Sequence, residues 1–113
     1  MEKPSVTVIV LNWNGKDLTI ECLESLKQVN YSNFNILVVD NGSTDGSVEL
    51  LKEKFPEVSI LVLEKNLGYA GGNNRGFDSL KPDPPEFVIF LNNDTTVDAV
   101  SYTHLTLPTS DLV

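Results

Sequence analysis

Four apolar runs in this chain each end in polar residues, and this repetition constrains the fold more than any single motif. The runs cover residues 6–11, 36–39, 58–63 and 87–91, and they are nearly continuous in Val, Ile, Leu and Phe. Such runs are typical of strands in a parallel sheet that is covered on both faces. The polar residues that follow them are Asn12-Trp13-Asn14, Asp40, Glu64-Lys65-Asn66 and Asn92-Asn93-Asp94. Since ligands of open parallel sheets bind outside the carboxyl ends of the strands, the four ends predict one binding site, and a nucleotide carrying phosphates suits it best.

Segments with helical periodicity separate the four runs and predict the order β-α-β-α-β-α-β. The first helix is expected to begin at an N-cap Asp17, and the third at Asn73 or Asn74. The second is expected to end before Pro56, because proline cannot continue a helix. The apolar positions expected to face the sheet are Leu18, Cys22, Leu23, Leu26 and Val29, then Val48, Leu51 and Phe55, then Phe77 and Leu80. This alternation predicts an α/β fold whose polar clusters share one edge of a parallel sheet.

The composition excludes several classes of protein. A chain of 113 residues has room for one domain only. Eight basic and sixteen acidic residues give a net charge of -8, so no nucleic-acid partner is expected. The lone Cys22 excludes an intrachain disulfide and a cysteine zinc cluster, and is expected to be a small buried residue. The first apolar run is too short for a transmembrane segment. We expect a cytoplasmic protein, or one that is peripheral at the inner membrane face.

The character of the sequence changes after Asp98. Residues 99–113 carry neither a helical stripe nor a clear strand boundary, and they resemble the translated sequencing-adapter tails at the ends of some gene predictions. We therefore expect a domain over residues 1–98, followed by an atypical tail that is an artefact. His104, the single histidine, lies in this tail and is given no catalytic role.

Two residues at strand ends each have two interpretations. The carboxylate of Asp40 could accept a hydrogen bond from a pyrimidine ring N–H or a ribose hydroxyl, or it could open the turn of residues 40–46 by accepting backbone N–H groups. The indole of Trp13 could stack on a base, or it could plug the end of the core. Each residue alone leaves both interpretations open.

Residues 66–76 form a glycine-rich connection from the third strand into the third helix. Glycine lets the backbone approach a ligand closely, and the free N–H groups at a helix start favour an anion such as a diphosphate. The spacing is neither that of the dinucleotide fingerprint nor that of a P-loop. The alternative interpretation is a flexible loop.

The cluster of residues 92–94 delivers a carboxylate at the end of an apolar strand. A hard cation such as Mg²⁺ or Mn²⁺ takes oxygen ligands and is often completed by substrate phosphates, so one protein carboxylate can suffice. The alternative is a turn or capping cluster.

Taken in order, these motifs resemble the amino-terminal half of family 2 glycosyltransferases, the inverting enzymes with the GT-A nucleotide-sugar fold. Residues 6–15 (VTVIVLNWNG) are similar to the first strand and base-binding turn, and residues 36–47 (ILVVDNGSTDGS) to the second strand with its nucleoside-binding aspartate. Residues 90–95 (FLNNDT) stand where the family has its Asp-x-Asp metal motif, and residues 66–76 are similar to the loop before it. The resemblance covers about residues 5–98, and it implies a Rossmann-like GT-A parallel sheet with alternating helices, truncated after the metal motif.

The resemblance also implies a set of site residues. Asp94 would bind the divalent metal, with Asn92 in place of the first aspartate of the motif, so one carboxylate replaces two. An arginine that many members carry at the position of Asn73 is absent, and only Arg75 lies nearby. The residues expected to bind the nucleotide are Leu11, Asn12, Trp13, Asp40, Asn66, Gly71, Asn73 and Asn74.

The function implied is that of a glycosyltransferase fragment. It would bind a UDP- or dTDP-sugar through Mg²⁺ or Mn²⁺ for inverting transfer of a hexose or deoxyhexose to a polysaccharide or glycolipid acceptor. The LNWN, GGNN and NNDT variants are similar to a subgroup that transfers rhamnose and related sugars to cell-surface polysaccharides. The family's general base stands well after the metal motif, beyond the end of this chain, so we expect donor binding without turnover by the chain alone.

Two alternatives come from other classes of protein. One is a non-catalytic nucleotide-binding module, or an inactive truncated fragment. The other is a nucleotidyltransferase that activates sugars; it is disfavoured because those enzymes have an early glycine-rich loop with basic residues, which residues 6–15 lack.

Overall fold

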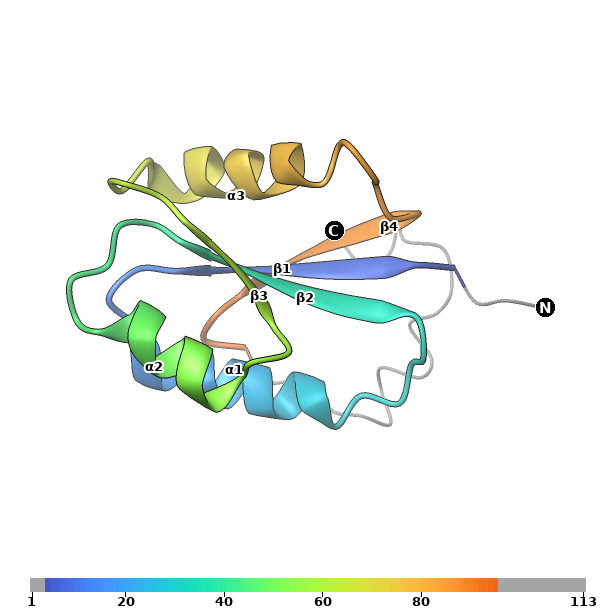
Figure 1. The fold of residues 1–113 in the computed structure, drawn as a ribbon, viewed down its shortest axis with the longest axis horizontal. Coiled ribbons are helices and arrows are strands. Elements are labelled where there is room, and N and C mark those ends of the chain that lie inside the picture. Colours follow the sequence, from blue (N-terminus) through green and yellow to red (C-terminus); the bar gives the residue numbers. More distant parts are fainter. Residues whose placement is uncertain (1–3, 96–113) are drawn as a thin grey trace.

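The computed structural model describes residues 4–95, which form a parallel four-stranded sheet between two layers of helices (Figure 1). Helices α1 and α2 cover one face of the sheet and α3 covers the other (Figure 1). The strands lie in the order β3-β2-β1-β4. The elements are β1 (Val6–Asn12), α1 (Lys16–Lys27), β2 (Phe34–Asp40), α2 (Ser47–Lys54), β3 (Ser59–Val62), α3 (Gly68–Ser79) and β4 (Phe87–Asn92). The predicted α/β class and element order are confirmed, whereas the predicted tail of residues 99–113 lies outside the described residues.

The register of the sheet aligns the carboxyl ends of its two central strands. Asn12 of β1 pairs with Asp40 of β2, and Leu11 of β1 pairs with Asn92 of β4. On the other side of β2, Asp40 pairs with Val62 of β3. All these pairings are parallel, so the polar strand ends lie at one edge of the sheet, as the sequence predicts.

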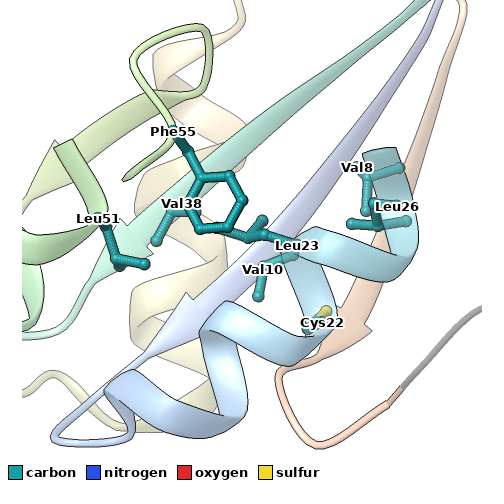
Figure 2. Packing of buried hydrophobic residues seen from close by; sticks show 8 residues of the cluster. All are labelled: Val8, Val10, Cys22, Leu23, Leu26, Val38, Leu51 and Phe55. Carbon is teal, nitrogen blue, oxygen red and sulfur yellow. The ribbon is translucent and has the colours of Figure 1, made fainter. Parts of the chain in front are cut away.

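The main core lies between the sheet and the layer of α1 and α2 (Figure 2). Its buried members are Val8, Val10, Cys22, Leu23, Leu26, Val38, Leu51 and Phe55. The expectation that Leu18 belongs to this face of α1 is wrong, because 47% of its surface is exposed. The buried face of α1 instead begins at Thr19, whose neighbours are the polar ends of the strands rather than the apolar core.

Helix α3 packs closely on the other face of the sheet through two glycines one turn apart. A Cβ at Gly72 would lie 2.5 Å from Leu11 Cδ1, and one at Gly76 would lie 2.6 Å from Val39 Cγ2. The helix therefore lies over β1 and β2 and covers the edge strand β4 only in part. Phe90 of β4 remains 42% exposed, with its ring 6.5 Å from that of Phe77 on α3. Phe77 is itself 45% exposed, so the expectation that it faces the sheet is wrong. The expectation that every strand is covered on both faces is thus wrong for β4, and also for the other edge strand β3, where Val62 is 50% exposed.

The predicted helix starts need correction. Helix α1 begins at Lys16 with Gly15 at the N-cap position and no side-chain cap, and Asp17 lies in its first turn, where a carboxylate favours the helix dipole. Helix α3 begins at Gly68, so Asn73 and Asn74 lie in its middle and cap nothing. The segment of residues 66–76 is therefore mostly helix and not a loop. Close contact with the sheet requires Gly72 and Gly76, and this requirement overrides their low helix propensity.

Candidate functional site

A cavity of about 250 Å³ opens at the carboxyl edge of the sheet. Its lining residues come from the end of β1, the start of α3 and the end of β4: Leu11, Trp13, Tyr69, Asn92, Asn93 and Asp94. Leu11 and Trp13 are predicted from the sequence to bind a nucleotide, and Asn92 and Asp94 to bind a metal. The fold brings these two sets, about 80 positions apart, to one cavity.

A larger cavity of about 380 Å³ lies at the opposite edge of the sheet. It is lined by residues at the amino ends of the strands and before β4, including Ser5, Asn35, Ser59 and Pro85. We favour the smaller cavity as the site on its chemistry, because it combines an exposed carboxylate with two aromatic side chains. The larger cavity is also lined by one carboxylate, that of Asp83, but by no aromatic side chain.

Two aromatic side chains stand exposed at the smaller cavity. Trp13 is 53% exposed and Tyr69, in the first turn of α3, is 59% exposed. The interpretation of Trp13 as a plug of the core is therefore wrong. Exposed rings of this kind can stack on a base. Tyr69 was not selected from the sequence, although an aromatic residue within a glycine-rich segment was a signal that could have found it.

Asp40 is buried, and its carboxylate is occupied by neighbouring groups. Its Oδ1 accepts hydrogen bonds from Asn12 Nδ2 at 2.8 Å and from the Ser43 hydroxyl at 2.7 Å. Its Oδ2 accepts the backbone N–H of Ser43 at 2.9 Å, which is the turn-opening contact considered for this residue. Asp40 thus organises the turn after β2, and its contact with a base stays a prediction.

The turns after β1 and β2 are tied to each other. The Asn14 backbone N–H donates to the Ser43 hydroxyl at 2.9 Å, and the Thr44 N–H donates to Asn14 Oδ1 at 2.7 Å. Asn14 has a positive φ of 48°, a conformation that asparagine tolerates better than most residues. On the other side of Trp13, the Asn12 carbonyl accepts the Asn41 N–H at 2.8 Å, so the turn that carries Trp13 is held at both ends.

The start of α3 is held by two asparagine side chains. Asn41 Oδ1 accepts the Leu67 N–H at 2.9 Å, and Asn41 Nδ2 donates to Asn66 Oδ1 at 3.0 Å. Asn66 Oδ1 also accepts the Gly68 N–H at 2.7 Å. Asn66 therefore shapes the turn into α3, and its contact with a nucleotide stays a prediction.

Three further candidates lie on α3 beyond its first residues. Asn73 is buried against the sheet, Asn74 is exposed and Gly71 is half-buried. None of the three is among the residues that line the smaller cavity. The helix begins at Gly68 and carries them away from the edge where a loop would have held them, so their contacts with a nucleotide also stay predictions.

Asp94 is the acidic group of the cavity. It is exposed in the turn after β4, where the Thr95 N–H donates to the Asn92 carbonyl at 3.1 Å. Within residues 4–95 no group of three or more His, Cys, Asp or Glu residues could hold a metal ion. The donor set at this edge is one carboxylate with neighbouring amide oxygens, facing an open cavity. Such a set fits a hard cation that keeps waters and takes phosphate oxygens from a substrate, and it does not fit a metal caged by protein groups alone.

Asp94 lies close enough to α1 for its charge to influence the pKa of the buried Cys22 thiol. Burial and, secondarily, the Asp94 charge raise the pKa of the Cys22 thiol to about 11. Its Sγ lies 4.0 Å from the carbonyl oxygen of Asn92. The turn that carries Asp94 therefore rests directly on α1.

A second carboxylate joins the starts of α1 and α2. Asp45 accepts hydrogen bonds from the hydroxyl and the N–H of Ser47 and from the Lys16 N–H. The Ser47 hydroxyl is the main reason why the pKa of Asp45 is lowered from its ordinary value. Asp45 therefore fixes two helix starts near the turn that follows β2.

Comparison with known proteins decides the family. The sequence model of Glycosyl transferase family 2 matches residues 7–105. The chain belongs to this family. Its fold is accordingly the Rossmann-like GT-A fold, as the resemblance implied.

Two relatives in sequence carry names that refer to teichoic or teichuronic acid. The chain is 30% identical over 102 residues to a teichoic acid poly(glycerol phosphate) polymerase of Staphylococcus epidermidis, covering 87% of this chain and 14% of that protein. It is 30% identical over 95 residues to the putative teichuronic acid biosynthesis glycosyltransferase TuaG of Bacillus subtilis, covering 81% and 36%. The chain thus spans well under half the length of these relatives.

Two solved structures of similar fold carry nucleotide sugars. S. aureus TarS 1–349 in complex with UDP-GlcNAc has a TM-score of 0.74 at 25% identity, over 95% of this chain and 31% of that one. The mannosyltransferase PcManGT from Pyrobaculum calidifontis, in complex with GDP-Man and Mn²⁺, has a TM-score of 0.68 at 27% identity, over 85% and 29%.

No helix within residues 4–95 has the length and apolar composition needed to cross a membrane. The cytoplasmic or peripheral location stays a prediction, as does the subgroup that transfers rhamnose.

Proposed function

We propose that this chain is the donor-binding part of a metal-dependent family 2 glycosyltransferase and that it binds a nucleoside-diphosphate sugar in the cavity between Trp13 and Asp94. The observation that carries the proposal is this cavity itself, which combines an exposed indole with an exposed carboxylate. The nucleotide-sugar complexes of TarS and PcManGT support the ligand class.

The base is proposed to lie at the end of β1. Trp13 and Tyr69 offer ring faces for stacking, and Leu11 lines the cavity beside them. The Asn12 carbonyl is already occupied by the Asn41 N–H at 2.8 Å. Asp40 stands one strand away, and its buried carboxylate fixes the Asn12 side chain. UDP or dTDP is the expected nucleotide, and the UDP-GlcNAc complex of TarS favours uridine.

The diphosphate is proposed to lie beside β4. Asp94 and Asn92 would hold a Mg²⁺ or Mn²⁺ ion through side-chain oxygens, and a cation there supplies positive charge to the departing diphosphate. The Mn²⁺ in the PcManGT complex supports this assignment. A single carboxylate leaves most coordination positions to water and phosphate, so metal binding is expected to be weak without nucleotide.

The acceptor is proposed to be a bacterial cell-surface polysaccharide or a glycolipid. The names of the teichoic acid polymerase and TuaG support this class. Inverting transfer also needs a general base that deprotonates the acceptor hydroxyl. As the resemblance implies, we propose that none of the 113 residues supplies this base, so the chain alone is expected to bind donor and to transfer no sugar.

Calorimetric titration of the 113-residue chain tests this function. We expect UDP to bind in the presence of Mn²⁺ and to bind at least tenfold more weakly after addition of EDTA. Asp94→Asn should show the weaker affinity under both conditions. Asp83→Asn, which removes an exposed carboxylate at the opposite edge, serves as the matched control and should bind as the unmodified chain does. Absence of binding by UDP, dTDP and GDP at millimolar concentration would refute the proposal. If the chain binds UDP, an assay of sugar transfer by a longer parent protein would distinguish an enzyme from a non-catalytic nucleotide-binding module.

A further inference from the structure

A continuous chain of side-chain hydrogen bonds crosses the carboxyl edge of the sheet from β4 to β2. Asn93 Nδ2 donates to the Thr19 hydroxyl at 3.1 Å, and the Thr19 hydroxyl donates to Asn12 Oδ1 at 2.6 Å. Asn12 Nδ2 then donates to Asp40 Oδ1 at 2.8 Å. These hydrogen bonds link Asn93, which lines the candidate cavity, to the carboxylate of Asp40, two strands away in the sheet.

The acceptor role of Asp40 at one end of this series of hydrogen bonds fixes the direction of the others. Both oxygens of Asp40 accept hydrogen bonds, and Asn12 presents its amide nitrogen to Asp40 Oδ1. The Asn12 oxygen then faces Thr19, whose hydroxyl must donate to it. The Thr19 oxygen is left to accept, and Asn93 must therefore present its nitrogen. The orientation of the Asn93 amide is thus determined by Asp40.

The middle of this chain is sealed from water. Thr19 and Asn12 have no exposed surface, and Asp40 is 1% exposed. A bond lost there leaves a buried polar group without a partner, which costs more than a bond lost at the surface. The series of hydrogen bonds is therefore rigid at Thr19, whose hydroxyl accepts the Asn93 amide.

Helix α1 supports the turn after β4 from two positions. Besides Thr19, it places Cys22 with Sγ 4.0 Å from the Asn92 carbonyl, one helical turn further along. The absence of a side chain at Gly15 makes room for Asn93, because a Cβ there would lie 2.8 Å from Asn93 Nδ2. The residues on either side of Asn93 are the two proposed to hold the metal.

We propose that Thr19 is a positioning residue that, through Asn93, holds the turn of residues 92–94 in the orientation that binds the donor diphosphate. The consequence for binding rests on the proposed function, whereas the hold on the turn does not. Thr19 touches neither nucleotide nor metal in this account; it acts through Asn93.

Hydrogen exchange tests the hold on the turn without any ligand. Thr19→Val keeps the shape of the side chain and removes the hydroxyl, and Thr19→Ser keeps the hydroxyl. Asn93→Ala breaks the chain at its half-buried end, where the loss is least able to prevent folding. We expect amide exchange at Thr95, whose N–H closes the turn, to accelerate about tenfold in the valine and alanine variants, as for loss of about one net hydrogen bond. In the serine variant the exchange rate at Thr95 should stay close to that of the unmodified protein. Unchanged exchange in both disruptive variants would overturn the inference.

Affinity for UDP tests the consequence for binding. In the presence of Mn²⁺ we expect Thr19→Val and Asn93→Ala to bind about tenfold more weakly and Thr19→Ser to restore the affinity. The metal-free affinity should be unchanged in Asn93→Ala, because this substitution leaves the hydrogen bonds of Asn12 to Thr19 and Asp40 on the base side in place. Faster exchange with unaltered affinity would refute the role in binding. If the unmodified chain binds no nucleotide, the proposed function fails, and the exchange measurement still decides whether Thr19 holds the turn.

Discussion

Asn12 and Asp40, which end the two central strands, are joined by a buried hydrogen bond of 2.8 Å across 28 positions of the sequence. The bond lies between directly paired residues of β1 and β2, so it fixes the two strand ends relative to each other. The turns that carry Trp13 and Ser43 begin there. The base side of the candidate site is therefore built on the sheet and not on free loops.

Replacing Asp40 by asparagine should destabilise the fold. The carboxylate accepts three hydrogen bonds in a buried setting, and an amide nitrogen in its place would face a donor. We expect the free energy of unfolding to fall by about 1–3 kcal/mol, measured by urea denaturation. Asp83→Asn, an exposed change of the same kind, should alter it by less than about 0.5 kcal/mol. Equal effects of the two substitutions would contradict the role of Asp40.

Gly76→Ala should destabilise the fold even though alanine is the better helix former. The added Cβ would lie 2.6 Å from Val39 Cγ2 and 3.3 Å from Ile9 Cγ2, both on stiff β-branched side chains. We expect a loss of about 1–3 kcal/mol from overpacking, seen as a lower melting temperature. Asn74→Ala on the exposed side of α3 makes a similar gain in helix propensity without the clash. A stabilised Gly76→Ala variant would show that α3 does not approach the sheet this closely.

Trp13→Ala should separate binding from stability. Because 53% of the indole is exposed, its removal should change the melting temperature little. Loss of a stacked base should weaken UDP binding by about 1–3 kcal/mol in calorimetric titration. Trp13→Phe, which keeps a ring, should recover part of the affinity. A Trp13→Ala variant that binds UDP normally but melts at a lower temperature would contradict the role in binding and support a role of Trp13 in the core.

Alkaline pH should destabilise the chain through Cys22. Burial raises the pKa of the folded thiol from 9.0 to about 11, so between these values the unfolded state loses its proton first. Stability contributed by the neutral thiol is complete below pH 9 and is lost as the pH rises toward 11. Urea midpoints measured across this range should fall more steeply for the unmodified chain than for Cys22→Ala. Parallel slopes would contradict the assigned environment of the thiol.

The strands were predictable from the sequence, whereas the helix starts were not. Apolar runs such as residues 6–11 are bounded by polar clusters, and the strands follow these bounds closely. Gly72 and Gly76 indicated a loop because glycine weakens helices, but contact with the sheet selects them inside α3. Their four-residue spacing is compatible with one face of a helix, but it does not by itself distinguish a helix packed on a sheet from a glycine-rich loop.

The candidate site was predictable in part, for a similar reason. Trp13 and Asp94 follow strands directly, so topology alone places them at the same edge. Thr19 and Asn93 could not be assigned to a hydrogen-bond chain, because their contact joins positions 74 residues apart. The buried carboxylate of Asp40 has two uses that look alike in sequence, and only its contacts distinguish them.

Mapping of UDP by NMR in the presence of Mg²⁺ tests the central claim most directly, because it locates the ligand on the fold. The account predicts that the largest chemical-shift changes fall on the Trp13 indole and on the backbone amides of Leu11, Tyr69 and Asp94, which line the cavity at the carboxyl edge. Amides at the opposite edge, such as Asn35, should shift little. Saturable changes centred on that opposite edge, or none at all, would contradict the assignment of this edge as the donor site.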